Sequence, residues 1–365
     1  MAEPARPLRV AIDAVHGKTG GGLTYLRAML PRLAGEAGFD LHLYAAAATL
    51  ALLAPIDTRV TVHEVTPWRG RLAEALWEQL RLPAILRFDR MDATFAPANF
   101  APLAAPRPVV LLRNALGVVA RERRLAQMLY WAVLALATWA SLLRCRRAIA
   151  VSEYARRRIA GPFARRATVV PHGVAEIFHP RPSPREAFLL AVGDLYPQKN
   201  FHALIEAFAL LRPARPALTL VIAGRRIDEG YAQELERRIA ALGLGTTVRF
   251  AGVVAQDALA ALYTRCAVFV FPSTVETFGN PLLEAMASGA PIACSRAAAM
   301  PEVLGDAGVY FDPDDVADMA RAVSSLLDDA ALRKNIAARG VTRAKSFSWA
   351  TTAARTAAIL REAAR

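Results

Sequence analysis

The 365-residue sequence predicts an α/β protein of two domains, each built on a parallel sheet. Short runs that are apolar throughout recur along the chain, as expected for strands covered on both faces. Segments with apolar residues at helical spacing separate nearly all of these runs. The chain also exceeds the length that one hydrophobic core usually serves, so two domains are expected.

The predicted strands fall into two sets. The first set is at residues 8–15, 41–46, 59–65, 107–112, 148–152 and 168–171, and the second is at 189–194, 218–224, 248–252, 268–273 and 291–295. A linker near 179–186, rich in proline and polar residues, separates the sets. We therefore expect two Rossmann-like domains facing a central cleft, over residues 1–180 and 181–345, and a final amphipathic helix over 346–365.

Composition excludes several classes of protein. Hydrophobic residues make up 55% of the chain, so a largely disordered protein is excluded. The three cysteines are far apart and no two of the six histidines are spaced by four, which disfavours a structural zinc site. The N-terminus leads directly into a strand without a signal peptide, so a reducing cytoplasm is the expected location.

Positive charge is concentrated in the first half. Residues 1–180 hold 24 Lys/Arg against 13 Asp/Glu, whereas the remainder holds 21 against 19. The partner of the first half is therefore expected to be anionic: nucleic acid, phospholipid or a phosphorylated ligand. The alternative is an arginine-rich surface in contact with solvent alone.

Two loops precede predicted helices in a similar way. The sequence HGKTGGG at 16–22 contains GKT, but the leading glycine of a Walker A loop is missing, and GxGxxG spacing is absent too. It is either a turn where ligand reaches the N–H groups of a helix start or an ordinary tight turn. In the second loop, Lys199 lies beside a helix start that Asn200 is expected to cap. Lys199 either shares an anion with that helix end or is simply exposed.

Two glutamates, Glu276 and Glu284, lie eight positions apart in PSTVETFGNPLLEAMASGAP at residues 272–291. This stretch follows a predicted buried strand, and open α/β sheets bind ligands at the carboxyl ends of their strands. Asn280 is expected to cap the next helix and Gly289 to end it, which puts Glu284 in the first turn. Glu284 could then merely complement the helix dipole, and Glu276 could be an exposed loop acid. Neither alternative explains the tight TFGNP turn between them.

These stretches closely resemble the retaining nucleotide-sugar glycosyltransferases of family 4, which have the GT-B fold. The resemblance rests on the E-x7-E pattern in FPSTVETFGNPLLEAMASGAPI, on VRFAGVVAQDALAALYTRCAVFVFPS before it, on MPEVLGDAGVYFDPDD after it, and on LAVGDLYPQKN. In the first half, GGGLTYLRAML, VSEYARRRI and VVPHGVAEIFHP match. The similarity covers nearly the whole second half and occurs as islands in the first.

The resemblance implies roles for the charged residues. Glu284 would hold the ribose hydroxyls of the donor nucleotide, and Glu276 would touch the transferring sugar. Lys199 would neutralise the diphosphate leaving group. The family's chemistry retains anomeric configuration and needs no metal or other cofactor, so we interpret the DPD at 312–314 as a turn and not as a metal-binding DxD.

The resemblance also implies roles for backbone groups. N–H groups around Phe278, Gly279 and Asn280 would cradle the sugar and phosphates. Gly21 and Gly22 would let the N-terminal loop close against the donor phosphate and the acceptor. The final helix would cross back onto the N-terminal domain, giving two crossings that permit hinge closure.

The sequence departs from the family pattern at several positions. Asp194 stands where an arginine often partners the lysine on the diphosphate, and Arg225 is our candidate substitute. His172 replaces a usual asparagine. Arg113 and Asn114 follow the strand at 107–112, where many members have a histidine.

Residues 125–143 form a run of nineteen residues without a formal charge. A membrane-spanning helix there would put strands of one sheet on opposite sides of a bilayer, which disfavours it. The alternatives are a domain helix or a monotopic membrane contact, with Trp131 or Trp139 at the interface. The flanking arginines, which would contact lipid phosphates, are Arg121, Arg123, Arg124, Arg144, Arg146 and Arg147.

The function expected is transfer of a hexosyl unit from a nucleotide diphosphate sugar (GDP-mannose, a UDP-sugar or a dTDP-sugar) to a glycan or lipid-linked acceptor. Surface polysaccharide or lipopolysaccharide assembly is the expected setting, in the cytoplasm or peripherally on the inner face of its membrane. The alternative is a non-catalytic partner in such an assembly, which the missing arginine at 194 favours and the intact Glu276, Glu284 and Lys199 oppose. Nucleic-acid binding is not expected, because no recognised module or interleaved aromatics occur.

Overall fold

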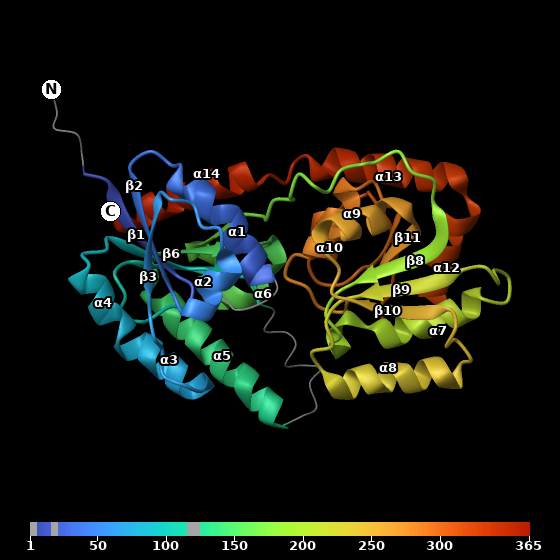
Figure 1. The fold of residues 1–365 in the computed structure, drawn as a ribbon, viewed down its shortest axis with the longest axis horizontal. Coiled ribbons are helices and arrows are strands. Elements are labelled where there is room, and N and C mark those ends of the chain that lie inside the picture. The colour runs from blue at the N-terminus through green and yellow to red at the C-terminus, as the bar shows by residue number, and fades with distance from the viewer. Residues whose placement is uncertain (1–5, 16–20, 115–124) are drawn as a thin grey trace. The chain divides into compact units, whose positions relative to one another are not determined.

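The computed structural model describes residues 6–15, 21–114 and 125–365. The chain divides into two compact units (Figure 1). Unit 1 comprises Met1–Gly173 and Ser348–Arg365, and unit 2 comprises Val174–Phe347. The unit boundary at Gly173 lies a few residues before the linker, so residues 174–180 group with the second unit.

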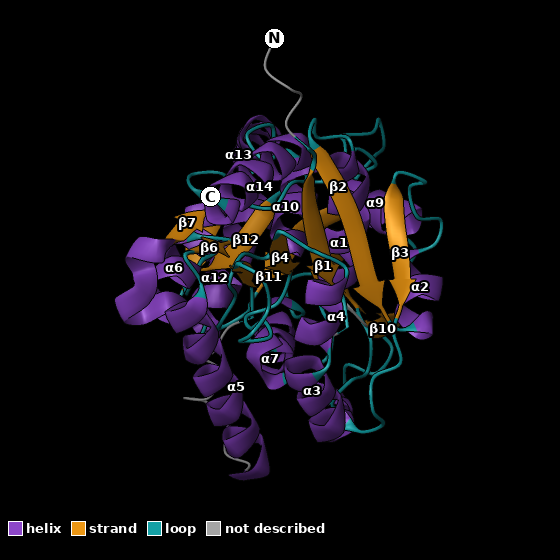
Figure 2. Cartoon of the chain, turned by 90° about the vertical axis from the view of Figure 1, so that its left-hand side faces the viewer, coloured by secondary structure: helices purple, strands orange, loops and turns teal. Residues whose placement is uncertain are grey.

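Unit 1 contains a seven-stranded sheet in the order β3-β2-β1-β4-β5-β6-β7, in which every paired strand is parallel. Figure 2 shows β3, β2 and β1 side by side. Its elements are β1 (Leu8–Asp13), α1 (Gly21–Ala34), β2 (Phe39–Ala45), α2 (Ala47–Leu53), β3 (Val60–Glu64), α3 (Arg71–Leu80), α4 (Leu82–Phe88), β4 (Ala93–Ala96), β5 (Pro108–Leu112), α5 (Leu125–Arg144), β6 (Arg147–Ala150), α6 (Glu153–Ala160), η2 (Gly161–Arg166), β7 (Ala167–Val169) and α14 (Trp349–Ala364).

Helices cover both faces of this sheet, which explains why its central strands are apolar throughout. All five residues of β5 are buried, and α3 and α4 pack on one face through a cluster that includes Tyr44, Trp77 and Leu86. The α1 and α14 helices pack against each other and against strands of the sheet. Burial on both faces is the general reason that parallel strands lack polar alternation.

The C-terminal helix α14 is an integral part of unit 1. The Trp349 ring stacks on His172 at 5.5 Å and meets Tyr25 edge-on at 5.8 Å between centroids. A Cβ on Gly173 would lie 2.1 Å from the Trp349 nitrogen, so only glycine allows the chain to pass there. His172, which stands where the family usually has an asparagine, therefore adds an aromatic ring to the packing of α14.

Unit 2 contains a six-stranded sheet in the order β10-β9-β8-β11-β12-β13, again with parallel pairing. Its elements are β8 (Glu186–Val192), η3 (Pro197–Lys199), α7 (Phe201–Leu211), β9 (Thr219–Ala223), α8 (Glu229–Ala241), β10 (Val248–Gly252), α9 (Gln256–Arg265), β11 (Cys266–Phe271), α10 (Asn280–Ala287), β12 (Ile292–Ser295), α11 (Met300–Leu304), β13 (Val309–Phe311), α12 (Val316–Asp328) and α13 (Ala330–Ala344). The apolar core under α7, α8 and α12 includes Leu189, Ile222 and Phe208.

The fold confirms the predicted α/β class with two parallel sheets. Two short strands were not predicted. β4 has four residues and β13 has three, so each is too short to give a recognisable apolar run. β4 pairs with β1, and β13 pairs with β12.

The uncharged run at 125–143 forms the helix α5. Among the helices that the structure describes, none is both long enough and apolar enough to cross a bilayer. Two of the flanking arginines are engaged: Arg147 pairs with Glu362 of α14, and Arg144 Nε donates to the Leu103 carbonyl at 3.2 Å. The side chain of Trp131 and the residues Arg121, Arg123 and Arg124 lie outside the described part of the chain.

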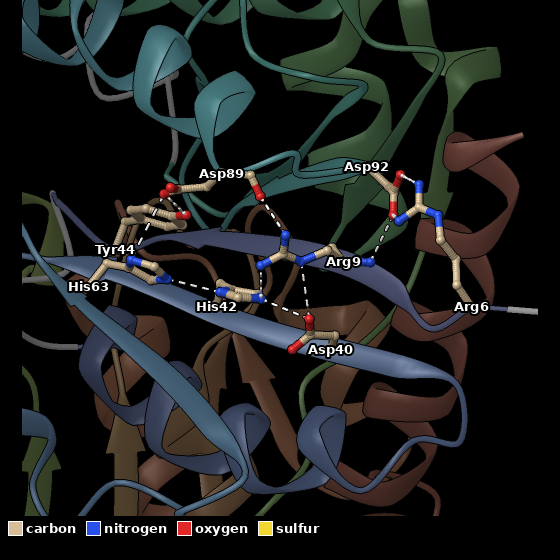
Figure 3. Close-up of polar contacts among 8 residues, drawn as sticks. All are labelled: Arg6, Arg9, Asp40, His42, Tyr44, His63, Asp89 and Asp92. Carbon is tan, nitrogen blue, oxygen red and sulfur yellow. Dashed lines mark hydrogen bonds and ion pairs between the residues drawn. The ribbon is translucent and has the colours of Figure 1, made fainter.

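A polar network crosses β1, β2 and β3 on the face covered by α4 (Figure 3). The His42 Nδ1 and His63 Nε2 atoms are 2.9 Å apart, and His42 Nε2 lies 3.0 Å from Asp40 Oδ2. The Tyr44 hydroxyl donates to Asp89 Oδ2 at 2.7 Å, and the Tyr44 ring stacks on His63 at 4.4 Å. Within the described residues no group of three or more acidic, histidine or cysteine side chains has metal-site geometry, so the network links strands through hydrogen bonds.

Candidate active site

The loops that follow β8 and β11 meet at the point where the strand order of unit 2 reverses. From β8 the chain proceeds through β9 to β10 on one side and through β11 to β13 on the other. At such a point the chain leaves two adjacent strands toward opposite sides of the sheet, and open α/β sheets bind ligands in the crevice between these loops. The loop after β8 carries Lys199, and the loop after β11 carries Glu276.

Lys199 and Glu276 form an ion pair, with Lys199 Nζ donating to Glu276 Oε1 at 2.5 Å. Both side chains are mostly buried, 16% and 17% exposed. Nζ also lies 5.8 Å from the centroid of the Phe271 ring. The structure therefore brings together the two residues predicted to act in catalysis, 77 positions apart in the sequence.

Hydrogen bonds between the two loops fix this pair. The Thr274 backbone nitrogen donates to the Gln198 carbonyl at 2.9 Å, and the Thr274 hydroxyl donates to the same oxygen at 3.3 Å. The Lys199 side chain passes over Gly193, where a Cβ would lie 3.0 Å from Cε of the lysine. The turn at Gly193 thus leaves room for the lysine stem.

The start of α10 differs by one residue from the expectation. The helix begins at Asn280, and Gly279 occupies the capping position with a φ of 92°. Only glycine adopts this conformation without strain, and a Cβ there would lie 3.2 Å from the Phe271 ring. The predicted cap at Asn280 is therefore wrong, and Glu284 is the fifth residue of the helix instead of lying in its first turn.

Glu284 is held by a residue that the sequence did not point to. The Tyr263 hydroxyl, on α9, donates to Glu284 Oε2 at 3.1 Å. Burial raises the pKa of the Glu284 carboxyl to about 7, and the hydrogen bond from Tyr263 only partly offsets this. A position in the second turn removes dipole complementarity as the reason for a glutamate here. A carboxyl held by one hydroxyl has further acceptor positions for the hydroxyls of a ligand.

Asp194, which stands where the family often has an arginine, forms an ion pair with Arg225. The Asp194 carboxylate accepts Arg225 Nε at 3.1 Å and Nη2 at 2.5 Å, and also the Arg225 backbone nitrogen at 3.0 Å. Arg225 follows Gly224, where a Cβ would lie 1.9 Å from the Gly193 carbonyl oxygen. The hydrogen bonds from Arg225 hold the pKa of Asp194 below its usual range in spite of partial burial.

The remaining predicted residues occupy different settings. The Phe278 ring is 3% exposed and packs edge-on against Phe347 at 5.8 Å, so only its backbone can serve a ligand. Asn200 precedes α7 in a left-handed conformation, with a φ of 57°, and its side chain donates to the Pro313 carbonyl at 2.8 Å. Asn200 therefore occupies the N-cap position of α7 as predicted, but its side chain makes no capping hydrogen bond.

The predicted glycines of the N-terminal loop belong to unit 1. Gly21 and Gly22 are the first two residues of α1. A Cβ on Gly22 would lie 2.4 Å from Arg113 Nη2, so this helix start packs closely on the guanidinium of Arg113. Arg113 Nε donates to the Pro97 carbonyl at 2.8 Å, and burial lowers the pKa of Arg113.

The acidic stretch at 312–315 forms a turn before α12. Asp312 Oδ1 accepts the backbone nitrogen of Asp314 at 2.9 Å, and Asp315 Oδ1 accepts that of Asp318 at 2.9 Å. The carboxylates thus cap backbone groups, which is the interpretation that the sequence favoured.

Similar folds occur among solved glycosyltransferases. Sucrose-phosphate synthase from Thermosynechococcus elongatus aligns with a TM-score of 0.80 at 20% identity, over 97% of this chain and 98% of its own. HepE of Anabaena, solved with UDP and glucose, aligns with a TM-score of 0.77 at 21% identity, over 97% of this chain and 99% of its own. Together with the two parallel-sheet units, these likenesses define a protein of the GT-B class.

Sequence comparison identifies the family. Residues 19–176 match the model for Glycosyltransferase Family 4, and residues 175–343 match that for Glycosyl transferases group 1. The chain belongs to glycosyltransferase family 4. A curated relative, the O-antigen chain mannosyltransferase B of Escherichia coli, is 37% identical over 170 residues, covering 45% of this chain and 43% of the relative. The chain spans less than half the length of the curated relatives it matches first.

Proposed function

We propose that the protein is a retaining, metal-independent glycosyltransferase that moves a hexosyl unit from a nucleotide diphosphate sugar to a glycan or lipid-linked acceptor. The observation that carries the proposal is the Lys199–Glu276 ion pair at the reversal of strand order, with Glu284 on the next helix. A diphosphate leaving group gains negative charge during transfer, and fixed cations that stabilise it lower the barrier.

In this proposal, different residues bind the ribose, the sugar and the diphosphate of the donor. Glu284 accepts hydrogen bonds from the ribose hydroxyls, and the N–H groups at the start of α10, around Phe278, Gly279 and Asn280, hold the sugar and phosphates. Lys199 and Arg225 neutralise the diphosphate, which is the role a divalent metal would otherwise have. Glu276, released from Lys199 as the phosphate arrives, faces the sugar. The contact of Gly21 and Gly22, the first two residues of α1, with the donor phosphate stays a prediction.

GDP-mannose is the donor we favour, ahead of UDP- and dTDP-sugars. The support is the name of the Escherichia coli relative, a mannosyltransferase of O-antigen chains. The same name supports a place in surface polysaccharide or lipopolysaccharide synthesis, on the cytoplasmic side where nucleotide sugars are made.

The test combines binding with turnover. A thermal-shift screen with GDP-mannose, UDP-glucose and dTDP-glucose identifies the donor, because a ligand that binds only the native state raises its stability. With the chosen donor, release of nucleoside diphosphate is measured with and without EDTA. Lys199→Ala and Glu284→Ala should each abolish turnover while far-UV circular dichroism and Tm stay close to native; Lys334→Ala, on an exposed position of α13, is the control.

Near-native turnover in both site variants would exclude the proposed site. A native chain that neither binds any of the three donors nor hydrolyses them would instead support the non-catalytic alternative. Loss of activity in EDTA that manganese restores would overturn metal independence alone.

A further inference from the structure

The helix α5 presents large apolar side chains to solvent. Val133, Leu136, Trp139 and Leu143 are 57%, 68%, 46% and 62% exposed. The buried side of the same helix includes two hydroxyl residues, Thr138 and Ser141, which are at most 2% exposed. A surface helix of a globular domain normally buries its apolar face and exposes its polar one.

The four exposed residues form one stripe along the helix. Their spacing of three, three and four positions places them on the same side of an α-helix. We call this set, Val133, Leu136, Trp139 and Leu143, the outer stripe. The Trp139 indole nitrogen donates to the Ile159 carbonyl at 3.2 Å, so its ring is fixed and not free to fold away from solvent.

The loop at 101–104 extends the apolar surface beyond the helix. The Ala101 backbone nitrogen donates to the Ser141 hydroxyl at 3.1 Å, which attaches the loop to α5. Leu103, 39% exposed, is attached through its carbonyl to Arg144 at 3.2 Å. On the other side Arg87 of α4 donates to the Ala104 carbonyl at 2.5 Å. Phe88, next to this arginine, is 87% exposed.

The exposed charge around this surface is positive. Among the described side chains of α3, α4, α5, the turn at 89–92 and the loop at 97–107, the exposed charged residues are all arginines, Arg81, Arg87, Arg90, Arg107 and Arg144, whereas the acids Glu74, Asp89 and Asp92 are half-buried. An apolar surface surrounded by arginines fits a partner that offers apolar chains below a layer of negative charge. A second copy of this chain would bring the same arginines face to face, which opposes self-association.

We propose that the outer stripe, with Leu103 and Phe88, docks on an anionic phospholipid membrane, with Arg87 and Arg144 at the headgroup phosphates. α3 and α5 project from the sheet of unit 1 in the same direction in both views (Figures 1 and 2). Docking of this kind needs no membrane-spanning segment, because an amphipathic helix binds within the interface. It goes beyond the proposed transfer reaction, since it can be measured without any donor.

The first experiment is co-sedimentation of the full chain with vesicles. Vesicles of phosphatidylcholine with phosphatidylglycerol at roughly 30 mol% should bind the chain at about 0.15 M salt, and pure phosphatidylcholine should bind it at least tenfold less. The variant Val133→Gln/Leu136→Gln/Leu143→Gln should lose at least tenfold in partition. Leu210→Gln/Leu242→Gln, at residues 59% and 42% exposed in unit 2, is the matched control and should bind as the native chain does.

The second experiment separates charge from local structure. Arg87→Gln/Arg144→Gln should weaken binding to anionic vesicles roughly 25-fold, which is about fivefold for each arginine. Arg87→Lys/Arg144→Lys keeps the charge but alters the hydrogen bonds to the loop, so it should bind within about twofold of native. If the glutamine and lysine double variants lose vesicle binding equally, the arginines act only by holding the loop, and their assignment to the headgroup phosphates is overturned.

The third experiment reports contact directly. Vesicles with brominated acyl chains should quench the tryptophan fluorescence of the native chain, and Trp139→Phe should remove much of that quenching. Absence of both sedimentation and quenching in a folded native chain would overturn the proposal. A dimer seen by light scattering that the triple glutamine variant dissociates, without vesicle binding, would assign the outer stripe to a second copy instead.

Discussion

Asp194 holds Arg225 by both of its carboxylate oxygens, one accepting Nε and the backbone nitrogen and the other accepting Nη2 at 2.5 Å. Asp194, which departs from the family pattern, therefore orients the guanidinium of Arg225, which follows the neighbouring strand β9. The loops after β8 and β9 thus bring Asp194 and Arg225 together, and the role of Arg225 as a substitute for the family's arginine stays a prediction. Bidentate pairing fixes the plane of the guanidinium and leaves its three other N–H groups for another anion.

Removing the guanidinium should weaken use of the donor. We expect Arg225→Ala to lower kcat/KM for the donor roughly 10–100-fold, since a charge-assisted hydrogen bond to phosphate contributes about 1.5–3 kcal/mol. Asp194→Ala should produce a smaller loss by freeing Arg225. The double variant should be no worse than Arg225→Ala, because Asp194 acts through the arginine. Arg226→Ala, an exposed neighbour paired with Glu229, is the control. Steady-state kinetics that showed additive losses would contradict this coupling.

Nucleotide affinity should depend on pH through Glu284. The carboxyl has a pKa of about 7 in the free chain, and only its ionised form accepts two hydrogen bonds from ribose. Calorimetric Kd for the nucleoside diphosphate should therefore weaken about tenfold between pH 8 and pH 6, as protonation removes the acceptor. Glu284→Gln should bind weakly with a flat profile. The same slope in Glu284→Gln would assign the pH dependence to the phosphate or to another group.

Stability should fall as pH drops below the ordinary range of histidine. Burial lowers the pKa of His63, which also faces His42, Arg9, Asp40 and Asp89. A histidine whose pKa is lower in the native state takes up protons first in the unfolded state, so the free energy of unfolding declines below about pH 6.5. Tm measured from pH 7.5 to 5 should show this decline.

Replacing the histidine identifies its share of that decline. His63→Gln should reduce the fall of Tm between pH 6.5 and 5, because the variant lacks the imidazole that takes up a proton more readily in the unfolded state. His179→Gln, on an exposed residue of unit 2, should leave the profile unchanged. If both variants retain the native slope, other groups, including the buried His202, determine the acid sensitivity.

Gly279→Ala should damage both stability and catalysis. The residue has a φ of 92°, and the new Cβ would lie 3.2 Å from the Phe271 ring, so α10 would shift away from the ion pair. We expect a loss of about 2–3 kcal/mol in urea unfolding and a larger relative loss of turnover. Gly243→Ala provides the comparison, because its φ is 66° but a Cβ there would meet no atom within 4 Å. It should cost about 1 kcal/mol and leave turnover intact; equal effects of the two would point to backbone strain alone.

The apolar runs of the sequence predicted the sheets well, since parallel strands buried on both faces need such runs. The E-x7-E stretch and the lysine after β8 predicted which loops carry charged groups, because each directly follows a strand. The cap at Asn280 was predicted wrongly, and Asn200 occupies its predicted N-cap position without a capping hydrogen bond from its side chain. In both places the backbone is left-handed at or just before the helix start, and side-chain preferences for capping do not register this.

The sequence by itself determined the α/β class, the family, the loops that carry Lys199 and Glu276, and the helix that carries Glu284. Only the tertiary structure decided which distant side chains meet: Lys199 with Glu276 across 77 positions, Arg225 with Asp194 across 31, and Tyr263 with Glu284 across 21. It also decided that α5 turns its hydroxyls inward and its large apolar residues outward. The physical reason is that local patterns fix where strands and helices form, whereas contacts between distant side chains depend on strand order and helix rotation, which arise from packing of the whole unit.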